Sequence, residues 1–346
     1  MKKVLIATTA LVGSAGMAAA EISFAGAARF GLTYVEDRTD DAGLDAETVI
    51  EQRLRFTVTG QATSDNGLEF EARIRAESGE SSDNSIGGND GGFGAAGFAV
   101  STGGLRLDVG NVSDVLDSGD TLNLFGFGVG FTSFIEQNSN SVGIPSNGFG
   151  AGDADQTNIK LRYNVGDFTI SASFSNNTSV ITTLVEPDPN DASVVAVNGE
   201  ANDIDEYQIG VGYSFGDYRI GAAFGSEDGD TVTRDAATGA VTSVEAVDND
   251  FWAIGFDGSV GAVDFAAVIT DSDDADDATF GFSLDYDVSA VTSIRFAAST
   301  GGDDDSDTSY GIGATHSLGG GVTLAGGIGS NSSGNTVADL GVTFGF

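Results

Sequence analysis

Arginines recur at every second position in several stretches near the start of the chain, which is the pattern that places them together on one side of a β-strand. Side chains alternate across a strand, so residues two apart share a face. In 49–61 the face opposite the arginines is apolar, with Leu54, Phe56 and Val58. The arginines that share this pattern are Arg29, Arg53, Arg55, Arg73 and Arg75. Guanidinium groups gathered on one wall of an aqueous passage would orient and filter polar or charged solutes.

These like charges need a partner. A turn at Ser64-Asp65-Asn66 would set Arg55 opposite Arg73 or Arg75, and like charges directly opposite each other destabilise a sheet. Two interpretations are open. The arginines are solvated residues of a wide pore wall, or an acidic element faces them across a narrow lumen. The acidic candidates lie in the long segment 111–156 and are Asp114, Asp117, Asp120 and Glu136.

Segment 111–156 is too long for an ordinary connection, and loops of this length are usually functional or disordered. Its apolar run from Leu124 to Phe131 argues against a disordered acidic loop. We expect the segment to fold into the lumen, with its aromatic residues packed on the inner wall and its carboxylates facing the arginines. The alternative is that the apolar run covers the top of the molecule or touches a neighbouring subunit.

Period-two alternation runs through almost the whole chain after the first 20 residues, without any capped helical pattern. It predicts sixteen strands with boundaries good to a few residues. They are 21–36, 49–61, 67–78, 94–101, 103–110, 157–165, 167–176, 203–215, 217–226, 249–258, 261–271, 277–287, 290–300, 307–317, 320–330 and 335–346.

The connections between these strands alternate between short turns and mostly longer segments. The longer ones are 37–48, 79–93, 111–156, 177–202, 227–248, 272–276, 301–306 and 331–334. Outer-membrane barrels sort their connections in this way. Only a helix or an edgeless sheet satisfies its backbone in hydrocarbon, and about sixteen strands enclose an aqueous channel. The sequence therefore predicts an all-β fold, a 16-stranded antiparallel transmembrane β-barrel with 111–156 as a constriction loop.

The ends of the chain and its composition favour the same class. Residues 1–20 have a basic start, a short apolar run and Ala18-Ala19-Ala20, which predicts a signal peptide and a barrel over 21–346. Removing Lys2 and Lys3 from the 14 basic residues leaves 12 against 52 acidic ones, a net charge of −40. This charge argues against a nucleic-acid partner, because no basic surface exists to neutralise phosphates. The chain has no cysteine, which excludes disulfides and thiolate metal sites.

The closing strand carries a family resemblance. It alternates Ala338, Leu340, Val342, Phe344 and Phe346 with small or polar residues and ends on an aromatic ring. Together with the opening strand from Ile22 to Gly31, the hairpin around Gly67-Leu68-Glu69-Phe70 and the run Ser317-Leu318-Gly319-Gly320-Gly321, it makes the chain resemble general-diffusion porins of the Gram-negative outer membrane, of the Rhodobacter-type alphaproteobacterial family.

The resemblance implies a trimeric sixteen-stranded barrel in the outer membrane, surrounded by lipid and lipopolysaccharide, with the third external loop folded inward. Arg29, Arg53, Arg55 and Arg75 would match the basic wall. Bound calcium also occurs in such porins; the Asp-rich loops 271–277 and 303–307 offer oxygen ligands, although loose screening by divalent cations is the simpler account. No other cofactor is expected.

We therefore expect passive diffusion of small hydrophilic solutes and ions, with a weak preference for cations because of the net charge. A substrate-specific outer-membrane channel is the main alternative, and an adhesive surface barrel is a third class. We expect no enzymatic activity, because the only histidine, His316, lies on an apolar face and no nucleophile–base arrangement is present.

Overall fold

The computed structural model describes residues 20–39, 43, 45–79, 92–150, 156–177, 180–183, 197–234 and 240–346. The predicted signal peptide lies outside the described residues except for Ala20. In the described part of the chain, no helix is long and apolar enough to cross a membrane. The strands are β1 (Glu21–Val35), β2 (Thr48–Thr63), β3 (Glu69–Gly79), β4 (Gly92–Phe93), β5 (Gly97–Thr102), β6 (Leu105–Gly110), β7 (Gln156–Val165), β8 (Phe168–Asn177), β9 (Val180–Thr183), β10 (Val197–Phe215), β11 (Tyr218–Arg234), β12 (Val241–Val260), β13 (Val263–Ser272), β14 (Asp277–Ser289), β15 (Thr292–Gly302), β16 (Ser309–Gly319), β17 (Val322–Ser330) and β18 (Thr336–Gly345).

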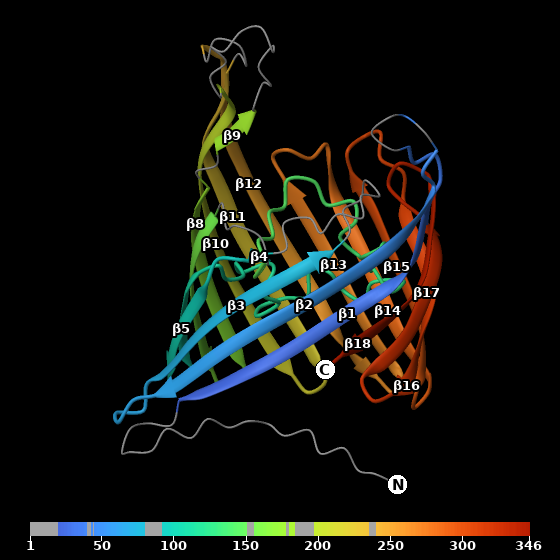
Figure 1. Ribbon diagram of the computed structural model, residues 1–346, viewed down its shortest axis with the longest axis horizontal. Helices are drawn as coiled ribbons and strands as arrows, with labels where there is room; N and C mark the ends of the chain where they lie inside the picture. Colours follow the sequence, from blue (N-terminus) through green and yellow to red (C-terminus); the bar gives the residue numbers. More distant parts are fainter. Residues whose placement is uncertain are drawn as a thin grey trace, which may run out of the picture.

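These segments form one closed antiparallel barrel of sixteen strands (Figure 1). β4 and β5 both pair with β3 and act as one interrupted strand, and β8 and β9 both pair with β10 and act as another. The barrel closes because β18 pairs with β1, from Ala27 opposite Gly345 to Val35 opposite Val337. The terminal Phe346 continues this pairing through two backbone hydrogen bonds with Gly26. The predicted fold class is confirmed.

The two faces of the barrel differ as the alternation predicts. Large apolar side chains are exposed on the outside all around the ring, for example Phe24 in β1, Ile209 in β10 and Leu340 in β18. In water such a surface would be unstable, but in a bilayer it contacts lipid, and the ladder leaves no unpaired backbone in hydrocarbon. The inner face carries the charged, hydroxyl and glycine residues.

The connections are sorted by length as predicted. Most turns at the end where β1 begins and β18 ends contain two residues, and Gly103-Gly104 shows why: both have positive φ, 55° and 86°, which glycine adopts without strain. The β2–β3 turn is longer than expected. Its hydrogen bonds join Ser64 to Leu68, so five residues separate the strands.

β10, β11 and β12 are longer than the sequence pattern suggested. The segments 177–202 and 227–248 were expected to be loops, but β10 begins at Val197, β11 continues to Arg234 and β12 begins at Val241. These extensions rise above the rest of the barrel in Figure 1. Their Asp and Glu residues resemble a loop composition, yet a strand that stands in water bears charge on both faces without a desolvation cost.

Candidate pore constriction

The loop that follows β6 lies inside the barrel, as expected. Figure 1 shows it, in green, within the ring of strands. Residues 111–150 are described, and 151–155 of the predicted segment lie outside the described residues. The loop leaves β6, crosses the inner faces of β7 to β18, turns near Ser133 and returns. Hydrogen bonds to the wall accompany it in both directions, from Leu116 to Gln208 of β10 on the way out and from Asn140 to Ser299 of β15 on the way back.

The apolar run of the loop packs on the inner wall, which is the second part of that expectation. Leu124 and Val129 are 1% and 0% exposed. Leu124 joins a core with Phe251 of β12, while Val129 and Ile135 form a second core with Ala297 of β15. The lumen of a pore contains water and has no continuous apolar core. Burial of apolar side chains in these two clusters therefore stabilises the docked loop, chiefly through the hydrophobic effect.

Glycines on the inner wall make room for the loop backbone. A Cβ on Gly281 of β14 would lie 1.7 Å from the carbonyl oxygen of Gln137, and one on Gly221 of β11 would lie 2.0 Å from that of Thr121. At both positions the loop backbone occupies the space of a side chain. The inward glycines therefore form a seat for the loop.

The tip of the loop is fixed by Asp339 of the closing strand. Its Oδ2 accepts hydrogen bonds from the backbone N–H and the hydroxyl of Thr132, at 2.9 and 2.7 Å. Hydrogen bonds to a carboxylate are stronger than neutral ones. Asp339 is only 6% exposed and holds the loop against β18. Sequence reasoning missed this role, although a lone acid among small inward residues was a visible signal.

The predicted basic wall lies on β1–β3, on the luminal face. Its register differs from expectation: Arg55 faces Glu77, not Arg73 or Arg75, because the preceding turn has five residues. Among the five predicted arginines, Arg29 lies directly opposite Arg53.

Carboxylates of the same strands neutralise much of this wall. Arg29 pairs with Glu51 at 2.5 Å, and Arg55 forms a short ion pair with Glu77. The facing loop was expected to supply this compensation, so the structure corrects the expectation for these two arginines. The spacing Glu51-x-Arg53-x-Arg55 and Arg75-x-Glu77 already put acids and bases on one face. That signal would have revealed the pairing.

Arg73 and Arg75 meet the returning end of the loop. Both guanidinium carbons lie 4.3 Å from the ring centroid of Phe149, and Arg75 Nη1 donates to the Phe149 carbonyl oxygen at 2.5 Å. Arg53 is half-buried and has no hydrogen bond or ion pair with the described residues. Like Arg73, it has guanidinium donors that make no direct contact with a carboxylate among the described residues.

The four predicted loop acids occupy different environments. Asp114 is 1% exposed in the neck of the loop, where its oxygens accept from Asn147, Asp117 and Gln208. Burial raises the pKa of Asp114 to about 6. Asp114 therefore joins the two ends of the loop to β10 and does not face the arginines, contrary to expectation. Asp117 is partly exposed beside Gly148.

Asp120 is the loop acid that pairs with bases of the wall. It contacts Lys160 at 2.9 Å and Arg162 at 2.6 Å, both on β7. Although burial opposes ionisation, these two hydrogen-bonded cations lower the pKa of Asp120. The loop thus supplies a carboxylate to bases of the wall, but on β7, against which it lies, and not to the five predicted arginines.

Glu136 lies on the returning part of the loop between two residues that face the wall. Ile135 and Gln137 are 1% and 0% exposed, whereas Glu136 is partly exposed and its carboxylate lies beside Gly128 of the outgoing part of the loop. It has no cationic partner among the described residues, and burial raises its pKa to about 7.

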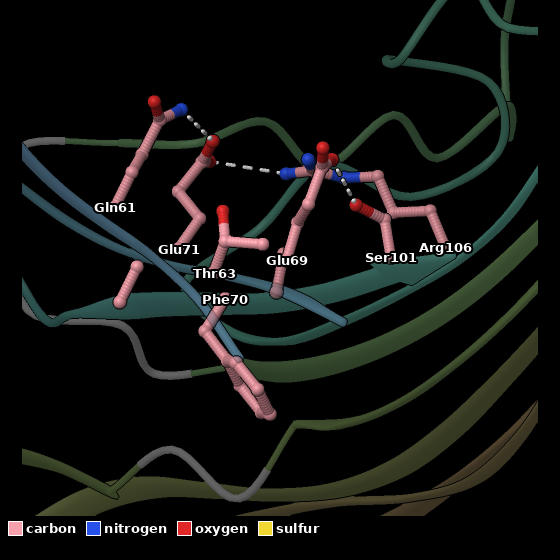
Figure 2. A pocket seen from close by; sticks show the side chains of 9 residues that line it. Gln61, Thr63, Glu69, Phe70, Glu71, Ser101 and Arg106 are labelled. Carbon is pink, nitrogen blue, oxygen red and sulfur yellow. Dashed lines mark hydrogen bonds and ion pairs between the residues drawn. The ribbon is translucent and has the colours of Figure 1, made fainter. Parts of the chain in front are cut away.

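A second polar site lies near the short-turn end of the barrel. Figure 2 shows Gln61, Glu71 and Arg106 in a row along a pocket of about 170 Å³. Gln61 donates to Glu71, which pairs with Arg106 at 3.0 Å, and Arg106 also contacts Asp108 at 2.8 Å. The same pairing principle therefore continues below the constriction.

Bases on the far wall also bind the loop. Arg219 of β11 donates to the carbonyl of Gly119 at 2.7 Å, and Arg295 of β15 donates to that of Gly128 at 3.4 Å. Each is paired with a carboxylate of its neighbouring strand. Among the described residues no group of three acidic, histidine or cysteine side chains could hold a metal ion, and a calcium site stays a prediction.

Comparison with known proteins agrees with this geometry. Residues 7–336 match the family model described as Gram-negative porin. A porin of Fuscovulum blasticum is 40% identical over 98 residues, which cover 28% of this chain and 32% of that protein. The chain thus aligns with about a third of that relative's length.

Solved structures match over nearly the whole chain. A triple mutant of the Rhodopseudomonas blastica porin superposes with a TM-score of 0.69 at 25% identity, covering 94% of this chain and all of that one. A second mutant of the same porin gives a TM-score of 0.67 at 23% identity with the same coverage. With its closed sixteen-stranded wall and inward loop, the chain belongs to the Gram-negative porin family of the outer membrane.

Proposed function

We propose that the protein is a general-diffusion porin, which lets small hydrophilic solutes and ions pass down their gradients. The observation that carries this proposal is the loop inside a barrel of sixteen strands. A barrel of this size has room for an aqueous channel. The loop occupies the side of β7–β18, which leaves the passage beside the charged wall of β1–β3 and β6.

We further propose a weak preference for cations. Most bases of the lumen are matched by a carboxylate within ion-pair distance, as Arg29, Arg106 and Lys160 illustrate. Glu136 is partly exposed and has no cationic partner among the described residues, and we propose that its carboxylate acts on the lumen. The chain as a whole is strongly acidic, so its field favours cations at the mouths of the channel.

Swelling of liposomes that contain the purified protein tests the diffusion mechanism. Flux should fall steadily with the size of uncharged sugars and should not saturate with concentration. Saturable flux of one solute would favour a substrate-specific channel. Absence of flux would contradict both and leave an adhesive barrel.

The family also suggests a homotrimer in contact with outer-membrane lipid and lipopolysaccharide, and we propose both. The apolar outer band supports either contact, because lipid and a second subunit demand the same surface. Native mass spectrometry from detergent should give three copies per particle. A monomer without lipid adducts would contradict this part of the proposal.

A further inference from the structure

The returning end of the constriction loop places an aromatic ring on two arginines of the basic wall. Phe149 lies 4.3 Å from both guanidinium carbons, and its carbonyl accepts from Arg75. A guanidinium attracts the face of an aromatic ring, and this attraction is stronger when the contact excludes water. The ring and the carbonyl thus occupy positions at which a planar anionic solute would otherwise meet these arginines.

The backbone on both sides of Phe149 is fixed. Asn147 exchanges hydrogen bonds with Asp114, through its own N–H to the Asp114 carboxylate and its carbonyl to the Asp114 N–H. Gly150 and Asn111 form a second reciprocal pair, at 3.1 and 3.0 Å. The ring is therefore held in place by the neck of the loop and does not depend on its contact with the arginines alone.

Arg73 and Arg75 differ in this from the rest of the basic wall. Arg29 and Arg55 have carboxylate partners, whereas neither Arg73 nor Arg75 forms an ion pair with the described residues. Glu71 acts on Arg73 and Glu77 acts on Arg75 electrostatically, without direct contact, so the two guanidinium charges are only partly balanced. Their remaining charge is covered on the luminal side by an apolar group, which keeps an anion at a distance without removing the field.

We propose that Phe149 is a specificity-determining residue: it shields Arg73 and Arg75 and so denies small carboxylate- or phosphate-bearing solutes a binding site on the basic wall. This inference rests on the proposed diffusion function. Without the ring, an anion could approach each guanidinium to about 4 Å in place of about 8 Å, which in a water-like dielectric raises its local concentration about fivefold for the two together.

The test is a double-mutant cycle measured by reversal potential in a potassium chloride gradient across a planar bilayer. F149A should raise the chloride-to-potassium permeability ratio severalfold, whereas F149Y, which keeps the ring, should match the wild type. Neutralising both arginines with R73Q and R75Q should abolish the increase in the F149A background and have a smaller effect with Phe149 present.

The outcomes separate this inference from the function on which it rests. An unchanged ratio in F149A, or an increase that persists after both arginines are neutralised, would overturn the shielding role while the channel still conducts. A wild type that does not conduct would instead refute the diffusion function. F149L keeps apolar bulk without a ring, and a ratio equal to that of F149A would show that the aromatic face is needed. A ratio equal to the wild type would show that steric cover suffices for the shielding.

Discussion

Glu136 should make the selectivity of the channel depend on pH near neutrality. Burial on the returning part of the loop raises its pKa from the ordinary 4.5 to about 7. The group is then roughly 10% ionised at pH 6 and roughly 90% at pH 8. A unit charge about 5 Å from the path of an ion, in a water-like dielectric screened by about 0.1 M salt, enriches cations roughly twofold and depletes anions by a similar factor.

Burial of Glu136 also determines whether loop docking becomes stronger or weaker as pH rises. In the docked loop Glu136 keeps its proton until about pH 7, whereas in water it would lose it near 4.5. Between these values the docked loop binds more protons, so docking weakens as pH rises through this window and is strongest below it. The full shift corresponds to about 3 kcal/mol. Rising pH therefore has two effects, a stronger cation preference and a less firmly held loop.

Reversal potentials at pH 5.5 to 8.5 measure the first effect. The potassium-to-chloride ratio of the wild type should rise severalfold with a midpoint near pH 7, and E136Q should lose that midpoint while it retains the basal conductance. Asp114 is 1% exposed in the neck of the loop and is hydrogen-bonded to Gln208, so it is buried away from the path and does not replace Glu136 as the source. A flat profile in the wild type, or the same midpoint in E136Q, would show that Glu136 does not set the pH dependence of the selectivity.

Three further changes test how the loop and the wall are held. D339A removes the acceptor of two Thr132 hydrogen bonds, each worth about 1.5–3 kcal/mol for a charged group, and should increase current noise and proteolysis of the loop. D339N keeps one acceptor oxygen, so its current noise and proteolysis should lie between those of the wild type and D339A. If D339A shows no more current noise than the wild type, Asp339 does not hold the tip of the loop. G281A should displace the loop and change the conductance, whereas G60A should not, because its added Cβ lies 4.0 Å from the nearest atom. Equal changes of conductance in the two variants would show that Gly281 is not needed to accommodate the loop. E77Q leaves Arg55 unpaired and should lower the potassium-to-chloride ratio, with an unchanged ratio arguing that the pair is irrelevant to permeation.

The sequence predicted the barrel well because the alternation that defines its strands involves only residues close together in the chain. Lipid on one side and water on the other impose period two, and the pattern from Leu54 to Val58 carries that information without any knowledge of distant contacts. The sequence pattern did not predict the extensions of β10–β12, because these parts of the strands stand in water, where no apolar face is required. The acidic residues of 227–248 are typical of a loop, although β-pairing continues into this segment.

Prediction of the site was less complete, because it depends on contacts between residues far apart in the chain. That a loop enters the lumen followed from its length and its apolar run. Which partner each of its acids contacts did not follow: Asp120 pairs with the base Lys160, and Asp114 accepts a hydrogen bond from the amide of Gln208, only because of the path of the loop along the wall. The pairing of Arg55 with Glu77 depended on two more residues in one turn, a difference that shifts every cross-strand pair.

The single-channel conductance of a loop-shortened variant shows whether the loop narrows the channel. Replacing 122–143 with a short Gly–Ser link keeps the neck, in which Asn111 and Gly150 pair, and removes the part that crosses the lumen. If the loop narrows a water-filled barrel, conductance in symmetrical potassium chloride should rise well above that of the wild type, and the size limit for sugars should rise with it. An unchanged conductance in a folded, membrane-inserted variant would contradict the account.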